Sequence, residues 1–185
     1  LGIYVGNPAV HSLGAMLFGP SLTRSLKTKN RFSATSLDQL PQMFAAFQLF
    51  GHQLMMPVPD VDHTQHLLVI GANPVVSNGS LMGAPGFRRR TRELQDRGGK
   101  LVVVDPRKTE TASLADQHVF IRPGTDALLL LGMLHSLFEE GRARGGAALE
   151  FTDGVDSIRE AVKPFELDFC ARGTGIEAPV IRQLA

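Results

Sequence analysis

The sequence predicts an α/β fold: a doubly wound, mostly parallel sheet with helices on both faces, followed by a helical C-terminal segment. Apolar runs at residues 3–5, 67–70 and 101–104 lack polar alternation, which is typical of parallel strands covered on both sides. Helical patterns separate the later runs, and the order strand–helix–strand places neighbouring strands parallel. Together these observations predict a Rossmann-like architecture.

Each expected element has its own signal. The helix that opens at Ser36 begins with a good cap residue and carries apolar side chains at helical spacing. The next helix ends at the pair Gly98-Gly99, and the Leu-rich helix that opens at Thr125-Asp126 has the clearest pattern. In chain order we expect strand 3–5, helix 36–50, strand 67–70, helix 86–97, strand 101–104, strand 118–121, and helices 125–141, 153–162 and 177–184.

The composition is that of a soluble globular protein and argues against several kinds of partner. A length of 185 residues suits one domain, and a net charge of +1 gives no field to attract nucleic acid. The apolar runs are too short to span a membrane, so we expect no direct insertion. A single cysteine, Cys170, allows no internal disulfide and is typical of the reducing cytoplasm. Because the chain opens at Leu1 inside a strand pattern, we expect an excised domain with partners on both sides.

Every expected strand ends in small or rigid backbone next to a polar side chain. Ligands of open parallel sheets bind beyond the carboxyl ends of the strands, where glycine permits close approach and proline fixes a turn. The four endings are Gly6-Asn7-Pro8, Gly71-Ala72-Asn73-Pro74, Asp105-Pro106-Arg107 and Arg122-Pro123-Gly124-Thr125-Asp126. We therefore expect a crevice for a polar, phosphate-bearing ligand at this edge.

The chemistry of these side chains suggests roles. Asp105 can accept hydrogen bonds from ribose hydroxyls, and Arg107 can present a forked donor to phosphate oxygens. The helix start at Gly124 favours an anion, while Asp126 can face the hydrogen-bonding edge of guanine. Simpler interpretations stay open: Asp126 as a helix cap, Asn73 as a residue that closes its own turn, and Asp105 with Arg107 as a surface ion pair.

Three strings resemble the molybdopterin oxidoreductase family, which includes formate dehydrogenases, nitrate reductases and dimethyl sulfoxide reductases. The resemblance covers most of the chain and is strongest from about residue 66 to 141. The strings are Leu68-Val69-Ile70-Gly71-Ala72-Asn73-Pro74, Lys100-Leu101-Val102-Val103-Val104-Asp105-Pro106-Arg107-Lys108-Thr109-Glu110-Thr111-Ala112 and Ile121-Arg122-Pro123-Gly124-Thr125-Asp126-Ala127.

The resemblance implies a bis(molybdopterin guanine dinucleotide) cofactor carrying molybdenum or tungsten. Residues 1–185 would then form a single domain that holds the guanine nucleotide part of one pterin, with 149–185 as its helical extension. Carried over by position, Gly71, Asn73 and Pro74 approach the pyrophosphate, Asp105, Pro106 and Arg107 meet the ribose and phosphates, and Pro123, Gly124 and Asp126 meet the guanine.

The resemblance also implies features of the whole enzyme. We expect an oxidoreductase, with a formate-dehydrogenase-like parent as the first hypothesis. Its partners would be the remaining domains, a small-molecule substrate and an electron-transfer partner. A four-iron four-sulfur cluster is expected in an N-terminal domain outside this chain, so the chain alone should be inactive. The segment that supplies the metal ligand in the family corresponds to residues 31–41. Ser36 or Asp38 could reach the metal there, with Ser36 as our candidate, but both also suit the N-terminal turn of a helix.

Two hypotheses from other classes remain. One is a molybdenum-free structural or electron-transfer subunit of a respiratory complex that shares the fold. The polar strand endings argue against it, because a subunit without the cofactor has no physical need for them. The other is a generic Rossmann-like domain for an adenine nucleotide, but no strand here is followed by the Gly-x-Gly-x-x-Gly pattern of such domains.

Overall fold

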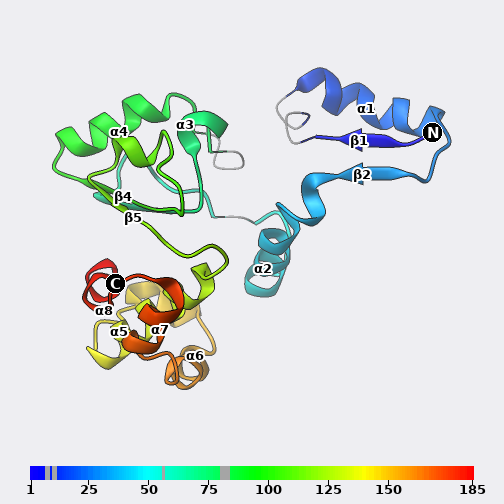
Figure 1. The fold of residues 1–185 in the computed structure, drawn as a ribbon. Helices are drawn as coiled ribbons and strands as arrows, with labels where there is room; N and C mark the ends of the chain where they lie inside the picture. The colour runs from blue at the N-terminus through cyan, green and yellow to red at the C-terminus, as the bar shows by residue number, and fades with distance from the viewer. Residues whose placement is uncertain (7–8, 10–11, 56, 80–83) are drawn as a thin grey trace. The chain divides into compact units, whose positions relative to one another are not determined.

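A computed structural model describes residues 1–6, 9, 12–55, 57–79 and 84–185 (Figure 1). The chain divides into two compact units, Leu1–Val58 and Pro59–Ala185. Within the described residues, no helix is both long and apolar enough to cross a membrane.

The first unit contains a small parallel sheet and two helices. Strand β1 pairs in parallel with β2, and Ile3 lies opposite Arg31. In chain order the elements are β1 (Ile3–Val5), α1 (Leu13–Ser25), β2 (Arg31–Ser33), the 3-10 helix η2 (Ala34–Ser36) and α2 (Leu40–Phe50).

The prediction that the first strand is buried in the same sheet as the others is wrong. Strand β1 pairs with β2 in a two-stranded sheet, separate from the sheet of the second unit. Tyr4 and Val5 are exposed, Tyr4 to 67%, and Ile3 is half-buried. The rest of its predicted ending, Asn7 and Pro8, lies outside the described residues.

The helix expected at 36–50 begins four residues later than predicted. Ser36 ends the short helix η2, and α2 starts at Leu40 with Gln39 at its cap position. Pro41 lies in the first turn of α2, where the missing amide is tolerated and the fixed φ suits a helix. The prediction that Ser36 caps this helix is therefore wrong.

The second unit is built on a three-stranded parallel sheet in the order β3–β4–β5. Helix α4 connects β3 to β4, as the crossover pattern predicted. The elements of this half are β3 (His66–Ile70), α3 (Pro74–Ser77), α4 (Phe87–Asp96), β4 (Lys100–Val104), the 3-10 helix η4 (Ala112–Leu114) and β5 (Gln117–Val119).

Alternate residues of the central strands bury their side chains in two different cores. Leu101 and Val103 of β4 pack with Leu94 of α4 on one face. Val104 packs with Leu129 on the other face, in a cluster that includes residues of the C-terminal helices. This two-sided burial explains why the strand sequences are apolar throughout. The predicted doubly wound fold with helices on both faces is confirmed.

Four helices form the layer on the second face. They are α5 (Asp126–Glu139), α6 (Val155–Val162), α7 (Leu167–Thr174) and α8 (Ala178–Leu184), with the 3-10 helix η5 (Gly146–Phe151) between α5 and α6 (Figure 1). A Cβ added at Gly132 would lie 2.9 Å from Cys170 Sγ, and one at Gly173 would overlap with Leu128 Cδ2. Glycine at these two positions thus permits α5 and α7 to pack at close range.

Candidate functional site

Two of the predicted strand endings come together where β3 ends and α5 begins. The Gly71 amide donates a hydrogen bond of 2.9 Å to the Val104 carbonyl, which continues the pairing of β3 with β4. Gly71 has φ +61°, a conformation that favours glycine. A Cβ added there would lie 4.0 Å from Asp126 Oδ1 and would meet no closer atom. The Asp126 carboxylate and the exposed Gly71 backbone therefore face a common space.

Asn73 ties the end of β3 to the loop that follows β4. Its Nδ2 donates to Glu110 Oε2 at 2.8 Å. Its Oδ1 accepts from the Thr111 amide at 3.2 Å and from Thr111 Oγ1 at 2.7 Å. The Asn73 side chain thus links two loops and does not close its own turn. Pro74, buried next to it, starts the single-turn helix α3.

Glu110 lies at the outer end of this link. The hydrogen bond from the Asn73 amide holds the pKa of the Glu110 carboxyl below its ordinary value, and the positive charges of Arg107 and Arg88 contribute in the same direction. Glu110 is therefore ionised at neutral pH, in a small group of charges at the carboxyl edge of the sheet.

The ending of β4 is a tight turn built by Asp105. Asp105 is 8% exposed, and its Oδ1 accepts a hydrogen bond of 2.8 Å from the Arg107 amide. Its carbonyl oxygen lies 3.1 Å from His118 Nε2. Pro106 and the Arg107 side chain are exposed, and Arg107 forms no ion pair with any residue that the structure describes. The anticipated surface pair of Asp105 with Arg107 is therefore replaced by a side chain-to-backbone turn that leaves the guanidinium open.

The segment after β5 is fastened to helix α7. The Arg122 amide donates to the Thr174 carbonyl at 2.8 Å, and Arg122 Nη1 donates to the Arg172 and Gly173 carbonyls, each at 2.9 Å. These acceptors lie at the C-terminal end of α7, where a cation is favourable. The next residues, Pro123 and Gly124, are exposed. Gly124 has φ +77°, and a Cβ added there would meet no atom within 4 Å.

The N-terminus of α5 carries no side-chain cap. Thr125 occupies the cap position, but its Oγ1 donates to the Arg122 carbonyl at 2.6 Å and bonds no helix amide. Asp126 is half-buried in the first turn and accepts no hydrogen bond from the described part of the chain. Free amides and the positive end of the helix dipole are therefore available to a ligand. The alternative that Asp126 simply caps the helix is not what the structure has.

This edge combines the groups that a phosphate-bearing nucleotide needs. Gly71 and Gly124 present backbone without side-chain obstruction, α5 presents uncapped amides, and Arg107 presents an exposed guanidinium. Asp126 adds a carboxylate that can accept hydrogen bonds from a base. The residues present therefore fit a nucleotide end of a cofactor.

Sequence reasoning assigned no role to Thr111 or Glu110. Both lie in the string that follows Asp105, and Thr111 is fully buried although it is polar. Buried polar groups in folded proteins are hydrogen-bonded, but which group they bond is not visible in the sequence. The candidate metal ligand Ser36 lies in η2, and its side chain lies outside what the structure describes.

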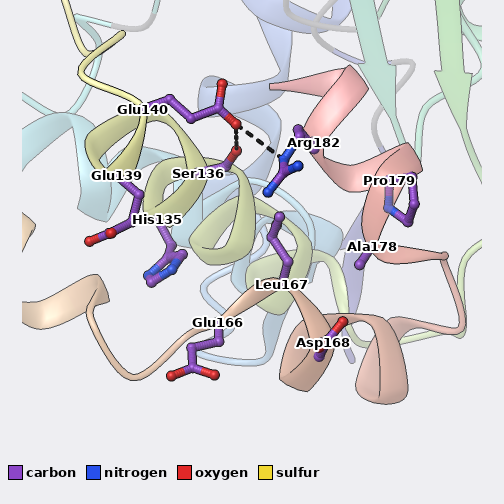
Figure 2. A pocket seen from close by; sticks show the side chains of 10 residues that line it. All are labelled: His135, Ser136, Glu139, Glu140, Glu166, Leu167, Asp168, Ala178, Pro179 and Arg182. Carbon is purple, nitrogen blue, oxygen red and sulfur yellow. Dashed lines mark hydrogen bonds and ion pairs between the residues drawn. The ribbon is translucent and has the colours of Figure 1, made fainter.

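Two hollows lie away from this edge. One of about 520 Å³ lies among the C-terminal helices, where Ser136 Oγ and Arg182 Nε both donate to Glu140 Oε1, at 3.3 Å and 3.1 Å (Figure 2). With a rise of about 1.5 Å per residue, Ser136 is roughly 15 Å along α5 from Asp126. The other, of about 460 Å³, lies beside the opposite end of β3 and includes His66. We place the candidate site by strand topology, because the polar endings converge there.

The described residues contain no cluster of metal-binding side chains. No group of three or more His, Cys, Asp or Glu side chains among the described residues is placed to hold a metal ion.

Comparison with known proteins shows which family this sequence resembles. Residues 11–157 match the family described as Molybdopterin oxidoreductase. The catalytic subunit of the assimilatory nitrate reductase of Bacillus subtilis (strain 168) is 27% identical over 182 residues, which are 97% of this chain and 25% of that protein. Formate dehydrogenase H of Escherichia coli (strain K12) is 30% identical over 146 residues, 78% of this chain and 20% of that protein.

A solved structure gives the same result for the fold. Acetylene hydratase from Pelobacter acetylenicus superimposes with a TM-score of 0.69 at 27% sequence identity, and covers 86% of this chain and 21% of its own. The chain thus spans a quarter or less of the length of these relatives.

Proposed function

The chain belongs to the molybdopterin oxidoreductase family, and on this premise we propose that its sheet edge holds the guanine nucleotide end of a molybdopterin guanine dinucleotide. The observation that carries the proposal is the uncapped N-terminus of α5, with the Asp126 carboxylate beside the open backbone of Gly71. Such a helix start favours an anion, and a carboxylate with no hydrogen-bond partner among the described residues favours a base with N–H donors.

Each residue then has a defined task. Gly71, Asn73 and Pro74 bring main chain to the pyrophosphate, and the Arg107 guanidinium meets the phosphate charge. Asp105 shapes the turn that carries Arg107, and its carboxylate lies next to the ribose. Pro106, between these two residues in the sequence, lies in the same turn and also meets the ribose and phosphates. Pro123 and Gly124 leave space for the base, and Asp126 accepts hydrogen bonds from the N–H groups of guanine, which adenine does not present in the same pattern.

For the whole protein we propose an oxidoreductase whose cofactor carries molybdenum or tungsten. When bound, that group supplies two-electron or oxygen-atom transfer, and the protein supplies its orientation and electrostatic surroundings. We retain Ser36 as the proposed metal ligand. A Ser36→Ala change in the full-length enzyme that leaves metal content and metal spectra unaltered would remove this assignment.

A nucleotide-dependent thermal shift tests the site directly. GDP at about a hundred times its dissociation constant should stabilise the chain by about 2.7 kcal/mol, which is a shift of a few degrees. We expect the shift with GDP, a smaller one with ADP or NAD, and loss of the GDP shift in Asp126→Ala.

Asp168→Ala is the matched control, because Asp168 lies in the first turn of α7 and has a similar relation to a helix dipole. Its GDP shift should equal that of the wild type. An equal or larger shift with ADP would contradict the guanine assignment. No shift with any nucleotide would contradict nucleotide binding by this chain and favour the cofactor-free structural subunit.

A further inference from the structure

Asn73, Thr111 and Glu110 form a polar link between the loops that follow β3 and β4, here called the Asn73 clamp. Thr111, 0% exposed, lies at its centre. The Thr111 hydroxyl donates to Asn73 Oδ1 at 2.7 Å and accepts from the Val75 amide at 3.1 Å. The clamp joins residues that are 36 to 38 positions apart in the sequence.

The hydrogen-bonding capacity of Asn73 is almost used up by these contacts. An asparagine side chain has one carbonyl oxygen with two lone pairs and one amide nitrogen with two hydrogens. Thr111 occupies both acceptor positions of Oδ1, and Glu110 receives one of the two hydrogens. A side chain so engaged has little capacity left for a phosphate, but it can hold the two loops at a fixed separation.

We propose that the Asn73 clamp is a positioning device, and that Thr111 is the residue on which it depends. The inference rests on the proposed function. It deepens that function by assigning Asn73 an indirect role: its side chain positions Gly71 and Pro74 on one side, and the Asp105 turn on the other. A ligand that contacts both loops binds more tightly when their separation is set in advance, because less ordering is needed on binding.

A role in stability alone is the competing explanation, and the same loop offers a control. The Thr109 hydroxyl is also buried, with the residue 4% exposed, and accepts a hydrogen bond of 3.0 Å from the Ala112 amide. It makes no contact with Asn73 among the hydrogen bonds of the described chain. Thr109→Val and Thr111→Val therefore remove the same chemical group from the same loop, but only the second breaks the clamp.

The experiment is GDP binding by calorimetry, at a temperature where every variant is folded, combined with amide hydrogen exchange. We expect Thr111→Val to bind GDP about tenfold more weakly, which corresponds to about 1.4 kcal/mol. Thr111→Ser, which keeps the hydroxyl, should bind within about twofold of the wild type, and Thr109→Val should be unchanged. Exchange at the Val75 amide should be about tenfold faster in Thr111→Val only, because that amide loses its acceptor.

A second route avoids dependence on one substitution. Asn73→Asp keeps the shape but places a carboxylate against Glu110, so GDP binding should weaken even if Thr111→Val fails to fold. In the double variant with Glu110→Gln, the new amide at position 110 can donate a hydrogen bond to the new carboxylate at position 73, the reverse of the native direction. This double variant should recover most of the lost GDP affinity. Recovery of this kind is not expected from a general loss of stability.

The outcomes separate the clamp from the proposed function. Equal weakening of GDP binding by Thr111→Val and Thr109→Val would overturn the clamp while leaving the nucleotide site in place. A wild-type chain that binds no GDP would count against the proposed function. Exchange would then decide: unchanged protection of Val75 in Thr111→Val overturns the clamp, and faster exchange supports its tie between the loops.

Discussion

The two compact units of the chain use their apolar side chains in opposite ways. In Pro59–Ala185, Leu94, Leu101 and Leu129 are completely buried on the two faces of one sheet. In Leu1–Val58, Ala46 is the only hydrophobic residue that is buried among those the structure describes, and α1 buries none of its residues.

Large apolar side chains of the first unit face outward. They include Phe18 at 73% exposed and Phe44 at 62%. Isolated helices of this length are marginally stable without packing against other apolar surface. The second unit therefore supplies its own core, whereas the described apolar side chains of the first unit are mostly exposed and bury little of their surface within it.

Core truncation should separate the two units most strongly. Leu129→Ala removes a completely buried side chain from α5 and should lower the free energy of unfolding by about 2–5 kcal/mol. Leu17→Ala removes the same atoms from α1, where the side chain is 60% exposed, and should change it by less than about 0.5 kcal/mol. Urea unfolding of both variants measures the contrast. A loss of several kcal/mol in Leu17→Ala would mean that the first unit has a core of its own.

Replacing a helical glycine with alanine should change the free energy of unfolding in opposite directions in the two units. Gly132→Ala places a methyl group 2.9 Å from Cys170 and should destabilise by about 1–3 kcal/mol. Gly14→Ala meets no atom within 4 Å, and alanine is the better helix former, so it should be neutral or stabilise by up to about 1 kcal/mol. Thermal unfolding of the two variants is the measurement. Equal effects would contradict the close approach of α5 to α7.

The dependence of stability on acidic pH should differ least between the two units. The Leu101 amide donates to Asp116 Oδ2 at 2.8 Å, and this hydrogen bond holds the pKa of the Asp116 carboxyl below its ordinary value of 3.8. Because the folded pKa is lower than the unfolded one, the stabilisation is complete above the unfolded pKa and is lost as pH falls through the folded one.

Asp116→Asn keeps the acceptor but removes the charge, so it should be less stable than the wild type at pH 7, with a difference that shrinks as pH falls below 3.8. Asp38→Asn in the first unit, where the carboxylate accepts no such backbone hydrogen bond among described residues, is the comparison. Unfolding by urea at a series of pH values checks both. A difference for Asp116→Asn that stays constant with pH would exclude the charge as the cause.

The central fold was predictable because its residues carry local signals. Strands β3 and β4 are continuous apolar runs, and α5 has apolar residues at helical spacing. Helix α1 was not predicted because it contains Gly14, Gly19 and Pro20, which normally interrupt a helix. Helix α7 was not predicted from the sequence for another reason. Gly173 reads as a break in the sequence but is required inside α7, because Leu128 occupies the space where its side chain would be.

The site was predictable only in part. The rule that strand ends converge identified Gly71, Asp105 and Asp126, since it depends on the order of elements alone. The Asn73 clamp was not predictable, because its hydrogen bonds depend on how two loops distant in sequence meet in three dimensions. Local sequence therefore indicates which residues lie at the edge, and tertiary structure determines what each of them bonds.

The close packing of Cys170 against Gly132 has a practical consequence. Cys170 is the one cysteine of the chain and is 0% exposed, and burial raises the pKa of its thiol. A thiol reagent can therefore modify it only when α5 and α7 separate, since the folded state offers neither access nor thiolate. The rate at which the reagent modifies Cys170 therefore reports how often the helical layer opens. The unaltered protein carries its own reporter of that motion, and no label has to be introduced.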